Sequence, residues 1–345
     1  MNHKLKPALI YLVLFALLLA AFIIGTSIGA VAISPLEVLK ILAGHIPGMK
    51  FLQVGIQPEY QTIIMTIRLP RVILTALVGA GLSLAGASFQ GLFRNPMADP
   101  YIIGVSSGAS LGAVISILVQ PMVVIPLKYG LPLMAFVFAG ITIWLVYQLA
   151  RVGDKVPVMT LLLAGIAVNT LLSALVSLGI YLSGNQLSQV VFWLMGGFSG
   201  RGWDYVYIFL PYALAGTAVI LVYARELNAL LLGEEPAQHL GIEVESVKTR
   251  LLVAAALLTG TCVAVSGQIG FVGLIVPHMV RMLFGADHRT LLPSAALLGA
   301  SLLLIADTLA RVIMAPGEIP VGIVTALVGG PFFIYLLRRQ KSALF

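Results

Sequence analysis

Residues 131–150 read LPLMAFVFAGITIWLVYQLA, twenty consecutive positions without a charged side chain. A membrane-spanning helix needs about 20 mostly apolar residues, so this stretch is long enough to cross the hydrocarbon core of a bilayer. The rest of the chain has the same character: of its 345 residues, 60% are hydrophobic and 10% are charged, and the mean hydropathy is +1.05. Soluble domains are about half apolar and about a quarter charged. The composition therefore excludes a soluble globular protein and makes the bilayer the solvent.

Uncharged or nearly uncharged stretches of this kind recur along the whole chain, and they number ten. They cover residues 7–36, 72–93, 100–120, 131–150, 157–183, 205–224, 251–267, 269–280, 291–306 and 319–337. The eighth stretch is short unless it extends beyond Arg281 to Gly285. The pattern predicts an all-α polytopic membrane protein with about ten transmembrane helices.

The positive charges set the expected orientation. If the N-terminus lies inside, the inner segments hold more Lys and Arg than the outer ones, which favours a cytoplasmic location for both termini. An even number of spans also requires both termini on one side. Ala30-Val31-Ala32 resembles a signal-peptide cleavage site, but the apolar run before it is about twice the usual length, so we expect a retained first helix.

The polar segments are too short to form a separate domain, so residues 1–345 are predicted to form a single transmembrane domain. A weak internal repeat is present: Gly79 and Gly86 are spaced seven apart, as are Gly260 and Gly267. The two helices are five spans apart and should run in opposite directions, which is typical of an inverted repeat. The alternative is that these glycines only allow close packing of membrane helices.

Several kinds of chemistry are missing from the sequence. There is no Gly-Lys-Ser or Gly-Lys-Thr, hence no phosphate-binding P-loop, and Leu182-Ser183-Gly184-Asn185-Gln186 is an outer segment that only superficially resembles an ATPase signature. Cys262 is the only cysteine, which excludes a disulfide framework and a Cys-rich metal cluster. We expect no catalytic residues, no metal site and no cofactor. The net charge of +7 is explained by the membrane, so no nucleic-acid partner is predicted.

Asp307 is the only convincing acidic residue within a predicted span. A buried carboxylate is typical of proton-coupled secondary carriers, but Arg311 lies four residues later, where the two side chains can form a local ion pair. His278 follows Pro277 and offers a haem ligand or a proton relay; a packed neutral histidine is the alternative.

Arg68-Leu69-Pro70-Arg71 opens the second span on the outer side, against the positive-inside trend. Proline suits the first turn of a helix, and arginines three apart are expected to face the same way, out of the membrane. Snorkelling to lipid phosphates explains them in one way. The other interpretation is a docking patch for an acidic partner, to which Arg311 contributes.

Three further segments indicate parts of the protein that move or contact a partner. Residues 94–100 contain two prolines that break the helix; the segment is either a simple turn or part of a gate, since gates are built where backbone is broken near a pathway. The small residues of 104–113 either pack helices closely or line a path. Residues 227–241 form the inner loop after the sixth span, with an apolar cluster, Glu234-Glu235 and then Gly241. An interfacial amphipathic helix is possible, but anionic lipid would repel the acidic pair, which favours a protein partner.

Together these segments resemble the permease subunits of ABC importers for iron complexes and cobalamin. The resemblance runs in order along nearly the whole chain, through Arg68-Leu69-Pro70-Arg71, Asn95-Pro96-Met97-Ala98-Asp99-Pro100 and Gly104-Val105-Ser106-Ser107-Gly108-Ala109. It continues through Leu194-Met195-Gly196-Gly197-Phe198, Gly233-Glu234-Glu235, Gly270-Phe271-Val272-Gly273-Leu274-Ile275-Val276-Pro277-His278 and Asp287-His288-Arg289. It ends with Ala306-Asp307-Thr308-Leu309-Ala310-Arg311 and Ile319-Pro320-Val321-Gly322.

The resemblance implies a multi-pass subunit of the bacterial cytoplasmic (inner) membrane. Its partners would be a second permease subunit, in a homodimer or heterodimer, two cytoplasmic ATPase subunits that hydrolyse ATP, and an extracytoplasmic binding protein. It assigns binding-protein docking to Arg68, Arg71 and Arg311, and ATPase coupling to the segment 225–250. The coupling residues are Leu230, Gly233, Glu234, Glu235, Ala237 and Gly241.

The same resemblance places Asn95 and Met97 near the cytoplasmic constriction of the path, and we add Ser106 and Ser107 as small polar residues beside it. The implied chain is a transport subunit and not an enzyme. A ferric siderophore is the expected cargo, with haem and cobalamin as alternatives. A secondary carrier driven through Asp307 is the alternative from another class.

Overall fold

The computed structural model describes residues 7–122, 126–153 and 155–341. Within these residues the regular secondary structure is entirely helical, apart from one isolated β-bridge between Val152 and Lys155. Eight helical stretches are long and apolar enough to cross a membrane. They centre on α1 (Pro7–Ser27), α4 (Leu69–Leu92), α5 (Val105–Val119), α6 (Leu127–Ala150), α7 (Val158–Leu182), α9 (Trp203–Val222), α12 (Val244–Ser266) and α14 (His288–Val312).

Two shorter apolar helices complete the set, α13 (Val272–Phe284) and α15 (Val321–Lys341). Their positions are those of the eighth and tenth predicted spans, and α13 does extend past Arg281, ending before Gly285. The structure therefore confirms the all-α polytopic fold. α13 is short because Phe271 and Gly285, at its two ends, have φ values of 70° and 98°, which a helix cannot continue through.

Three predicted boundaries were wrong. The first helix ends at Ser27 and not at residue 36, because Ser34 caps a separate helix, α2 (Pro35–Gly44), in a capping box with Glu37. The second span begins earlier than residue 72, since α3 (Pro58–Thr62) and the π-helical turn η2 (Ile63–Arg68) run directly into α4. The third span begins at Val105, after the short helix η3 (Pro100–Ile103).

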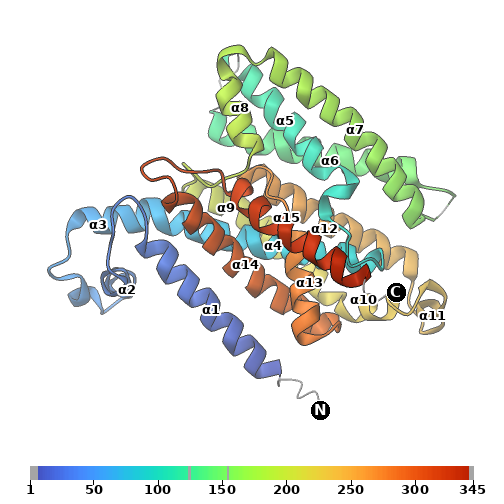
Figure 1. Ribbon diagram of the computed structural model, residues 1–345, viewed down its shortest axis with the longest axis horizontal. Coiled ribbons are helices and arrows are strands. Elements are labelled where there is room, and N and C mark those ends of the chain that lie inside the picture. The colour runs from blue at the N-terminus through green and yellow to red at the C-terminus, as the bar shows by residue number, and fades with distance from the viewer. Residues whose placement is uncertain (1–6, 123–125, 154, 342–345) are drawn as a thin grey trace.

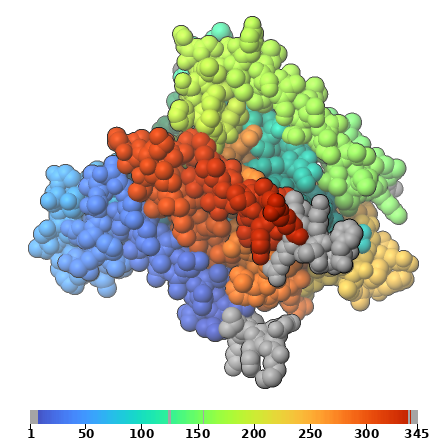
Figure 2. Space-filling model, viewed as in Figure 1, coloured from blue at the N-terminus to red at the C-terminus, as the bar shows by residue number. Residues whose placement is uncertain are grey.

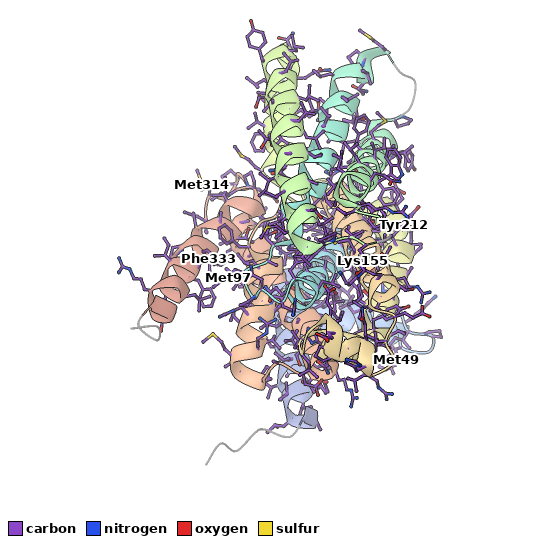
Figure 3. The ribbon with its side chains drawn as sticks, turned by 90° about the vertical axis from the view of Figure 1, so that its right-hand side faces the viewer. Met49, Met97, Lys155, Tyr212, Met314 and Phe333 are labelled. Atoms are coloured by element: carbon purple, nitrogen blue, oxygen red, sulfur yellow. The ribbon has the colours of Figure 1, made fainter. Side chains whose placement is uncertain are left out.

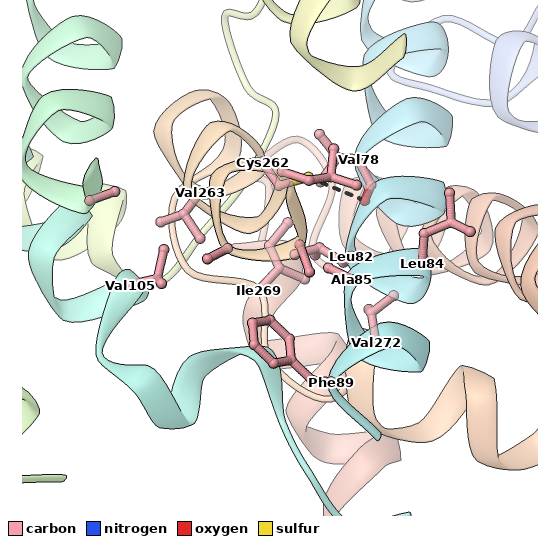
Figure 4. Packing of buried hydrophobic residues seen from close by; sticks show 14 of the residues in the cluster. Val78, Leu82, Leu84, Ala85, Phe89, Val105, Cys262, Val263, Ile269 and Val272 are labelled. Atoms are coloured by element: carbon pink, nitrogen blue, oxygen red, sulfur yellow. Dashed lines mark hydrogen bonds between the residues drawn. The ribbon is translucent and has the colours of Figure 1, made fainter. Parts of the chain in front are cut away.

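Helix α4 is the centre of the bundle: α14, α12, α13 and α9 all pack against it. Glycine makes this close packing possible. A Cβ atom on Gly86 would lie 1.8 Å from the carbonyl oxygen of Gly273 on α13, and one on Gly79 would lie 2.4 Å from that of Gly299 on α14. Figure 4 shows the α4–α12 contact, where the Cys262 thiol donates to the carbonyl oxygen of Val78. Packing thus accounts for Gly79 and Gly86, while the inverted repeat stays a prediction.

The long helices run between two ends of the molecule (Figure 1). Helices α2, α3 and α8 (Leu187–Leu194) and the α14–α15 loop lie toward the left of the view, here called the α8 end. Both termini, α10 (Ala224–Leu230) and α11 (Glu234–His239) lie toward the right, here called the α11 end. The termini share an end, as an even number of crossings requires, and the predicted orientation makes the α11 end cytoplasmic.

Helices α15 and α9 lie on opposite sides of the bundle. In the space-filling view, α15 (red) crosses the face between the N-terminal helices (blue) and the α5–α8 region (green), as Figure 2 shows. In the side view of Figure 3, Met314 and Phe333 lie on one side of the molecule and Tyr212 of α9 on the other.

Candidate functional site: the arginine cluster, the outer cavity and the coupling segment

Two of the predicted docking arginines close the C-terminal end of α1. Arg68 donates from Nη1 to the carbonyl oxygens of Thr26 and Ser27, at 2.9 and 2.7 Å. Arg311 donates to those of Gly25 and Ile28, both at 2.9 Å. The last carbonyls of a helix have no partner within it and carry partial negative charge, so a guanidinium group both pairs and neutralises them.

The third arginine, Arg71, is the centre of a buried ion network. Its Nη2 lies 2.8 Å from Asp307, and its Nη1 lies 2.9 Å from Glu318 in the α14–α15 loop. Arg311 also contacts Asp307, at 3.2 Å, so the local ion pair expected from the four-residue spacing is present. Asp307 is buried, whereas about a third of the Glu318 side chain is exposed.

The expected orientation of these arginines was wrong. Arg68, Arg71 and Arg311 expose only 6, 9 and 7% of their surface, and they point into the protein instead of out of the membrane. The physical reason is that α14 packs against α4 and the end of α1 packs against α14, so the three helices enclose these side chains. A guanidinium group enclosed in this way must find carbonyl or carboxylate partners, because an unpaired buried charge is very costly.

A cavity of about 510 Å³ opens beside this network at the α8 end, here called the outer cavity. Arg71, Asp307 and Glu318 lie at one side of it. The remaining wall combines aromatic and cationic side chains, among them Phe192, Trp193, Phe198, Tyr205, Lys128 and Arg201. Sequence reasoning missed both cations. The partner of Lys128, Asp204, is 76 positions away, whereas Arg201 lies over the ring of Tyr205, and that four-residue spacing was a signal in the sequence. Lys128 is held by Asp204 at 3.0 Å, whereas Arg201 has no ion pair among the described residues. The lining therefore suits a ligand with apolar faces and an acidic group that Arg201 can bind.

At the opposite end, the predicted coupling residues fall into two groups. Leu230 and Ala237 are buried and hold α10 and α11 against the bundle. Gly233, at φ 124°, makes the turn between them, a conformation that favours glycine. Glu234 binds Lys248 of α12 at 3.0 Å, whereas Glu235 and Gly241 are exposed.

Part of the exposed surface of this segment is apolar, in agreement with the apolar cluster that the sequence places before the acidic turn. Leu231, Leu232 and Leu240 are 40, 69 and 65% exposed. Large exposed apolar side chains around an acidic turn are typical of a protein contact. The geometry therefore separates Leu230 and Ala237, which support the segment, from the leucines that a partner can touch.

Asn228 joins α10 to the start of α14. Its Oδ1 accepts from the backbone N–H of His288 at 2.8 Å, and its Nδ2 donates to Asp287 at 2.6 Å. The Nδ1 atom of His288 lies 2.9 Å from the same Oδ1. Asp287 also caps α14 through the Arg289 N–H, and these hydrogen bonds hold the pKa of the Asp287 carboxyl below its ordinary value. We call Asn228, Asp287 and His288 the α10–α14 clamp.

The predicted gate residues lie in turns and helix contacts. Asn95 accepts from the Met97 N–H at 2.9 Å and so shapes the turn after α4, beside Arg94 at φ 48°. Ser106 is buried in α5, while Ser107 donates to Asn169 of α7. Burial raises the pKa of the nearby Asp99 carboxyl, although a hydrogen bond from the Tyr101 N–H opposes that rise. His278 is partly buried, and its Nδ1 has no partner among the described residues.

Comparisons with known proteins agree with this architecture. The family model described as the FecCD transport family matches residues 17–339. The chain belongs to the FecCD transport family. It is therefore a permease of the ABC importer class that handles iron complexes and cobalamin, as the sequence resemblance predicted.

Individual FecCD relatives are similar over most of their length. The chain is 50% identical to the cobalamin import system permease protein BtuC of Halobacterium salinarum, over 84% of this chain and 77% of the relative. It is 47% identical to the hemin transport system permease protein HmuU of Yersinia pestis, over 81 and 84%. A solved metal-chelate type ABC transporter in an inward-facing conformation has a TM-score of 0.84 at 35% identity, covering 97% of this chain and all of that one.

Proposed function

We propose that this chain is the transmembrane permease subunit of an ATP-driven importer that carries a metal chelate into the bacterial cytoplasm. The observation that carries the proposal is the whole-chain likeness to the solved metal-chelate transporter. The proposed assembly contains a second permease subunit, two cytoplasmic ATPase subunits and a binding protein at the α8 end. No step requires chemistry in this chain, since each is a shift between conformations driven by differential binding.

The proposed docking site for the binding protein is the rim of the outer cavity. Arg71 is the docking arginine that lines this cavity, and its partner Glu318 is accessible enough to be replaced by a carboxylate of another protein. Arg68 and Arg311 hold the C-terminal end of α1 in place. We therefore assign them an indirect role at the same docking surface. Docking through charges should weaken with salt, because exposed charges more than ~8 Å apart are screened at physiological ionic strength.

For the cargo we favour a metal tetrapyrrole, haem or cobalamin. The two relatives described above carry hemin and cobalamin in their names. The aromatic and cationic lining of the outer cavity fits haem, a flat macrocycle with two carboxylate substituents; for cobalamin, whose ring carries neutral amides, only the aromatic part of the lining is an argument. A ferric siderophore, the cargo expected from the sequence, is the second candidate, and the metal-chelate type of the solved structural relative favours it.

The coupling proposal concerns the α11 end. Leu231, Leu232 and Leu240, with Glu235 beside them, would enter a cleft of the ATPase, while Leu230, Gly233, Glu234, Ala237 and Gly241 keep α10 and α11 in shape. Asn95, Met97, Ser106 and Ser107 remain proposed path residues. Their present contacts lie in the turn after α4 and in the α5–α7 contact, the elements that would have to move during transport.

A secondary carrier driven by protons through Asp307 is the competing function. Asp307 already accepts from the guanidinium groups of Arg71 and Arg311, so its contacts describe a structural ion network. An ion network of this kind explains the buried carboxylate without any proton movement.

Uptake in reconstituted vesicles tests both functions. Vesicles that contain the chain, the ATPase and the binding protein should take up haem or cobalamin only when ATP is present on the side of the membrane where the ATPase lies. Vanadate should stop this uptake. Uptake that continues without ATP and collapses with the proton gradient would overturn the proposal. Arg71→Glu should reduce binding-protein affinity, with Lys40→Glu, an exposed residue of α2, as the matched charge control.

A further inference from the structure

A long apolar groove follows the outer surface of the bundle between α6, α9 and α12, apart from the outer cavity and the coupling segment. Its volume is about 740 Å³, and Phe136, Tyr212, Ala215, Ala218, Val253 and Leu257 are among its lining residues. A second cavity of about 260 Å³ shares Phe136, Tyr212 and Thr261 with it and continues toward Tyr129. Tyr212 is labelled in Figure 3, on the side of the molecule away from Phe333 of α15.

Small side chains open the groove. α9 presents Ala215, Gly216 and Ala218 where a membrane helix usually presents larger apolar residues, and α12 presents Ala254 opposite them. Along α12 the groove extends from Thr249 to Thr261. At 1.5 Å per residue that is about 18 Å, a little more than half of the roughly 30 Å hydrocarbon thickness. The groove therefore has the length of the acyl chains of one leaflet.

Arg250 and two of the tyrosines sit at the ends of this apolar surface, whereas Tyr212 and Thr261 lie where the two cavities join. Arg250 and Tyr223 lie at the α11 end, where Arg250 donates from Nη1 to the Tyr223 hydroxyl at 2.8 Å. Tyr129 lies at the α8 end. Tyrosine is enriched where a membrane protein meets the headgroups at either interface. Tyrosines at both ends of an apolar groove therefore favour lipid over a protein partner.

The charged side chains at the α11 end of the groove indicate which class of lipid headgroup it would bind. Arg250 is exposed, and within the described residues no carboxylate lies in ion-pair distance of it, although the charge of Glu243 is close enough to be felt. Arg225 follows Tyr223 by two residues and is also exposed, without an ion pair in the described part of the chain. A lipid phosphate carrying net negative charge would pair with these cations, and a zwitterionic headgroup would gain much less.

We propose that the groove between α6, α9 and α12 binds one anionic phospholipid, with its acyl chains along Ala215 and Ala218 and its phosphate on Arg250. The site is independent of the transport proposal, because it needs neither cargo nor ATPase. The bound lipid fills the groove where these small side chains leave space. It also holds α9 against α12. From α9 the chain continues into α10 and α11, which belong to the coupling segment.

Native mass spectrometry of the full-length chain, purified in detergent, tests the site. The probes are phosphatidylglycerol and phosphatidylcholine with identical acyl chains. The wild type should retain one phosphatidylglycerol in preference to phosphatidylcholine. Arg250→Gln should lower phosphatidylglycerol retention about fivefold, the factor expected for one basic residue near an anionic lipid headgroup. Arg289→Gln, an exposed cation at the same end on α14, should leave retention unchanged.

A second pair of variants tests the groove itself. Ala218→Leu fills it from its exposed side and should reduce retention of both lipids, whereas Ala16→Leu, at an exposed position of α1, should not. Unfolding temperatures in the same detergent show that each variant is folded. Equal retention of the two lipids, no retained lipid, or no effect of Arg250→Gln and Ala218→Leu would overturn the proposal. A second protein copy that is lost with Ala218→Leu would overturn it in favour of a dimer interface.

Discussion

The arginines at the α8 end show how a single charged side chain is accommodated in a membrane bundle. Arg68 and Arg311 satisfy carbonyl oxygens at the end of α1, and Arg71 satisfies two carboxylates. Each guanidinium group has several donors in a fixed plane, which lysine cannot reproduce. Arginine is therefore required here for geometry as well as for charge.

Arg68→Ala should destabilise the fold. It leaves the Thr26 and Ser27 carbonyl oxygens without their donors, and a lost hydrogen bond to a charged group costs about 1.5 to 3 kcal/mol. We expect a clearly lower unfolding temperature in detergent, and an intermediate value for Arg68→Lys. Lys40→Ala, an exposed residue on α2, is the control. An unchanged unfolding temperature for Arg68→Ala would contradict the assigned role.

Asp99→Asn should stabilise the protein at neutral pH. Burial raises the pKa of the Asp99 carboxyl above the ordinary 3.8, so the folded state binds this proton more tightly than the unfolded state does. The stabilising contribution of this proton is complete below the unfolded pKa and is lost as the pH rises through the folded pKa. Asparagine stays neutral and can still accept from the Tyr101 N–H.

The measurement is the difference in unfolding temperature between Asp99→Asn and the wild type from pH 4 to pH 8. The variant should gain most at pH 8, and its advantage should shrink toward pH 4. A variant that is less stable than the wild type at pH 8 would show that the charged carboxylate has a favourable partner.

Between elements, close contact of helices depends on where glycine is placed. Gly86 and Gly140 both lie within long helices, α4 and α6. Only Gly86 has a backbone atom of another helix within reach of a Cβ. The two positions therefore form a matched pair for substitution.

Gly86→Ala should prevent normal packing of α4 against α13, because its Cβ would lie 1.8 Å from the Gly273 carbonyl oxygen. Gly140→Ala meets nothing within 4 Å and should be neutral or stabilise the protein by up to about 1 kcal/mol through helix propensity. Yield of monodisperse protein and its unfolding temperature measure both effects. Similar behaviour of the two variants would refute the packing argument.

The α10–α14 clamp connects the coupling segment to the bundle. Asn228→Ala removes the acceptor of His288 N–H and the donor to Asp287. We expect less cargo transported per ATP hydrolysed in the reconstituted importer, since α10 would move without α14. Asn228→Gln keeps the amide but displaces it by one methylene, and Gln148→Ala, at an exposed position of α6 outside the coupling segment, is the control.

A measurement on the purified chain alone, without ATPase or binding protein, separates this effect from the transport proposal. Hydrogen exchange of residues 224–241 in the purified chain should be faster in Asn228→Ala than in the wild type. Unaltered exchange would mean that other contacts of α10 hold the segment.

For the whole molecule, the ends of the bundle define the predicted orientation. The α8 end must be outside and the α11 end inside if the outer cavity is to receive cargo and α10 and α11 are to meet an ATPase. The charge distribution favours this orientation. It is the assumption on which docking and coupling both depend.

Thiol labelling tests it. Cys262 is buried and can be replaced by serine, after which Met49→Cys in the loop after α2 and Gln238→Cys on α11 provide single accessible thiols. A membrane-impermeant maleimide added to intact spheroplasts should label Met49→Cys at once and Gln238→Cys only after permeabilisation. The reverse pattern would invert the orientation and both assignments with it.

The sequence by itself determined the membrane class and the spans. Twenty uncharged residues such as 131–150 have one stable arrangement in a bilayer, a helix, because backbone groups cannot remain unpaired there. Order and spacing of motifs along the chain were enough to predict the family. The coupling segment was also predicted, since an acidic turn between apolar residues is a local signal.

The four-residue spacing of Asp307 and Arg311 predicted their ion pair, but only the tertiary structure decided what the other charged residues of this cluster contact. Arg71 meets Asp307 and Glu318 across 236 and 247 positions of sequence, and Arg68 meets α1 across about 40. No local pattern encodes such pairs, because they arise when α1, α4 and α14 pack together. The same holds for the outer cavity and the lipid groove, whose walls come from separate helices. In a bilayer, apolar length is a property of each segment, whereas the partner of a buried charge is a property of the packed bundle.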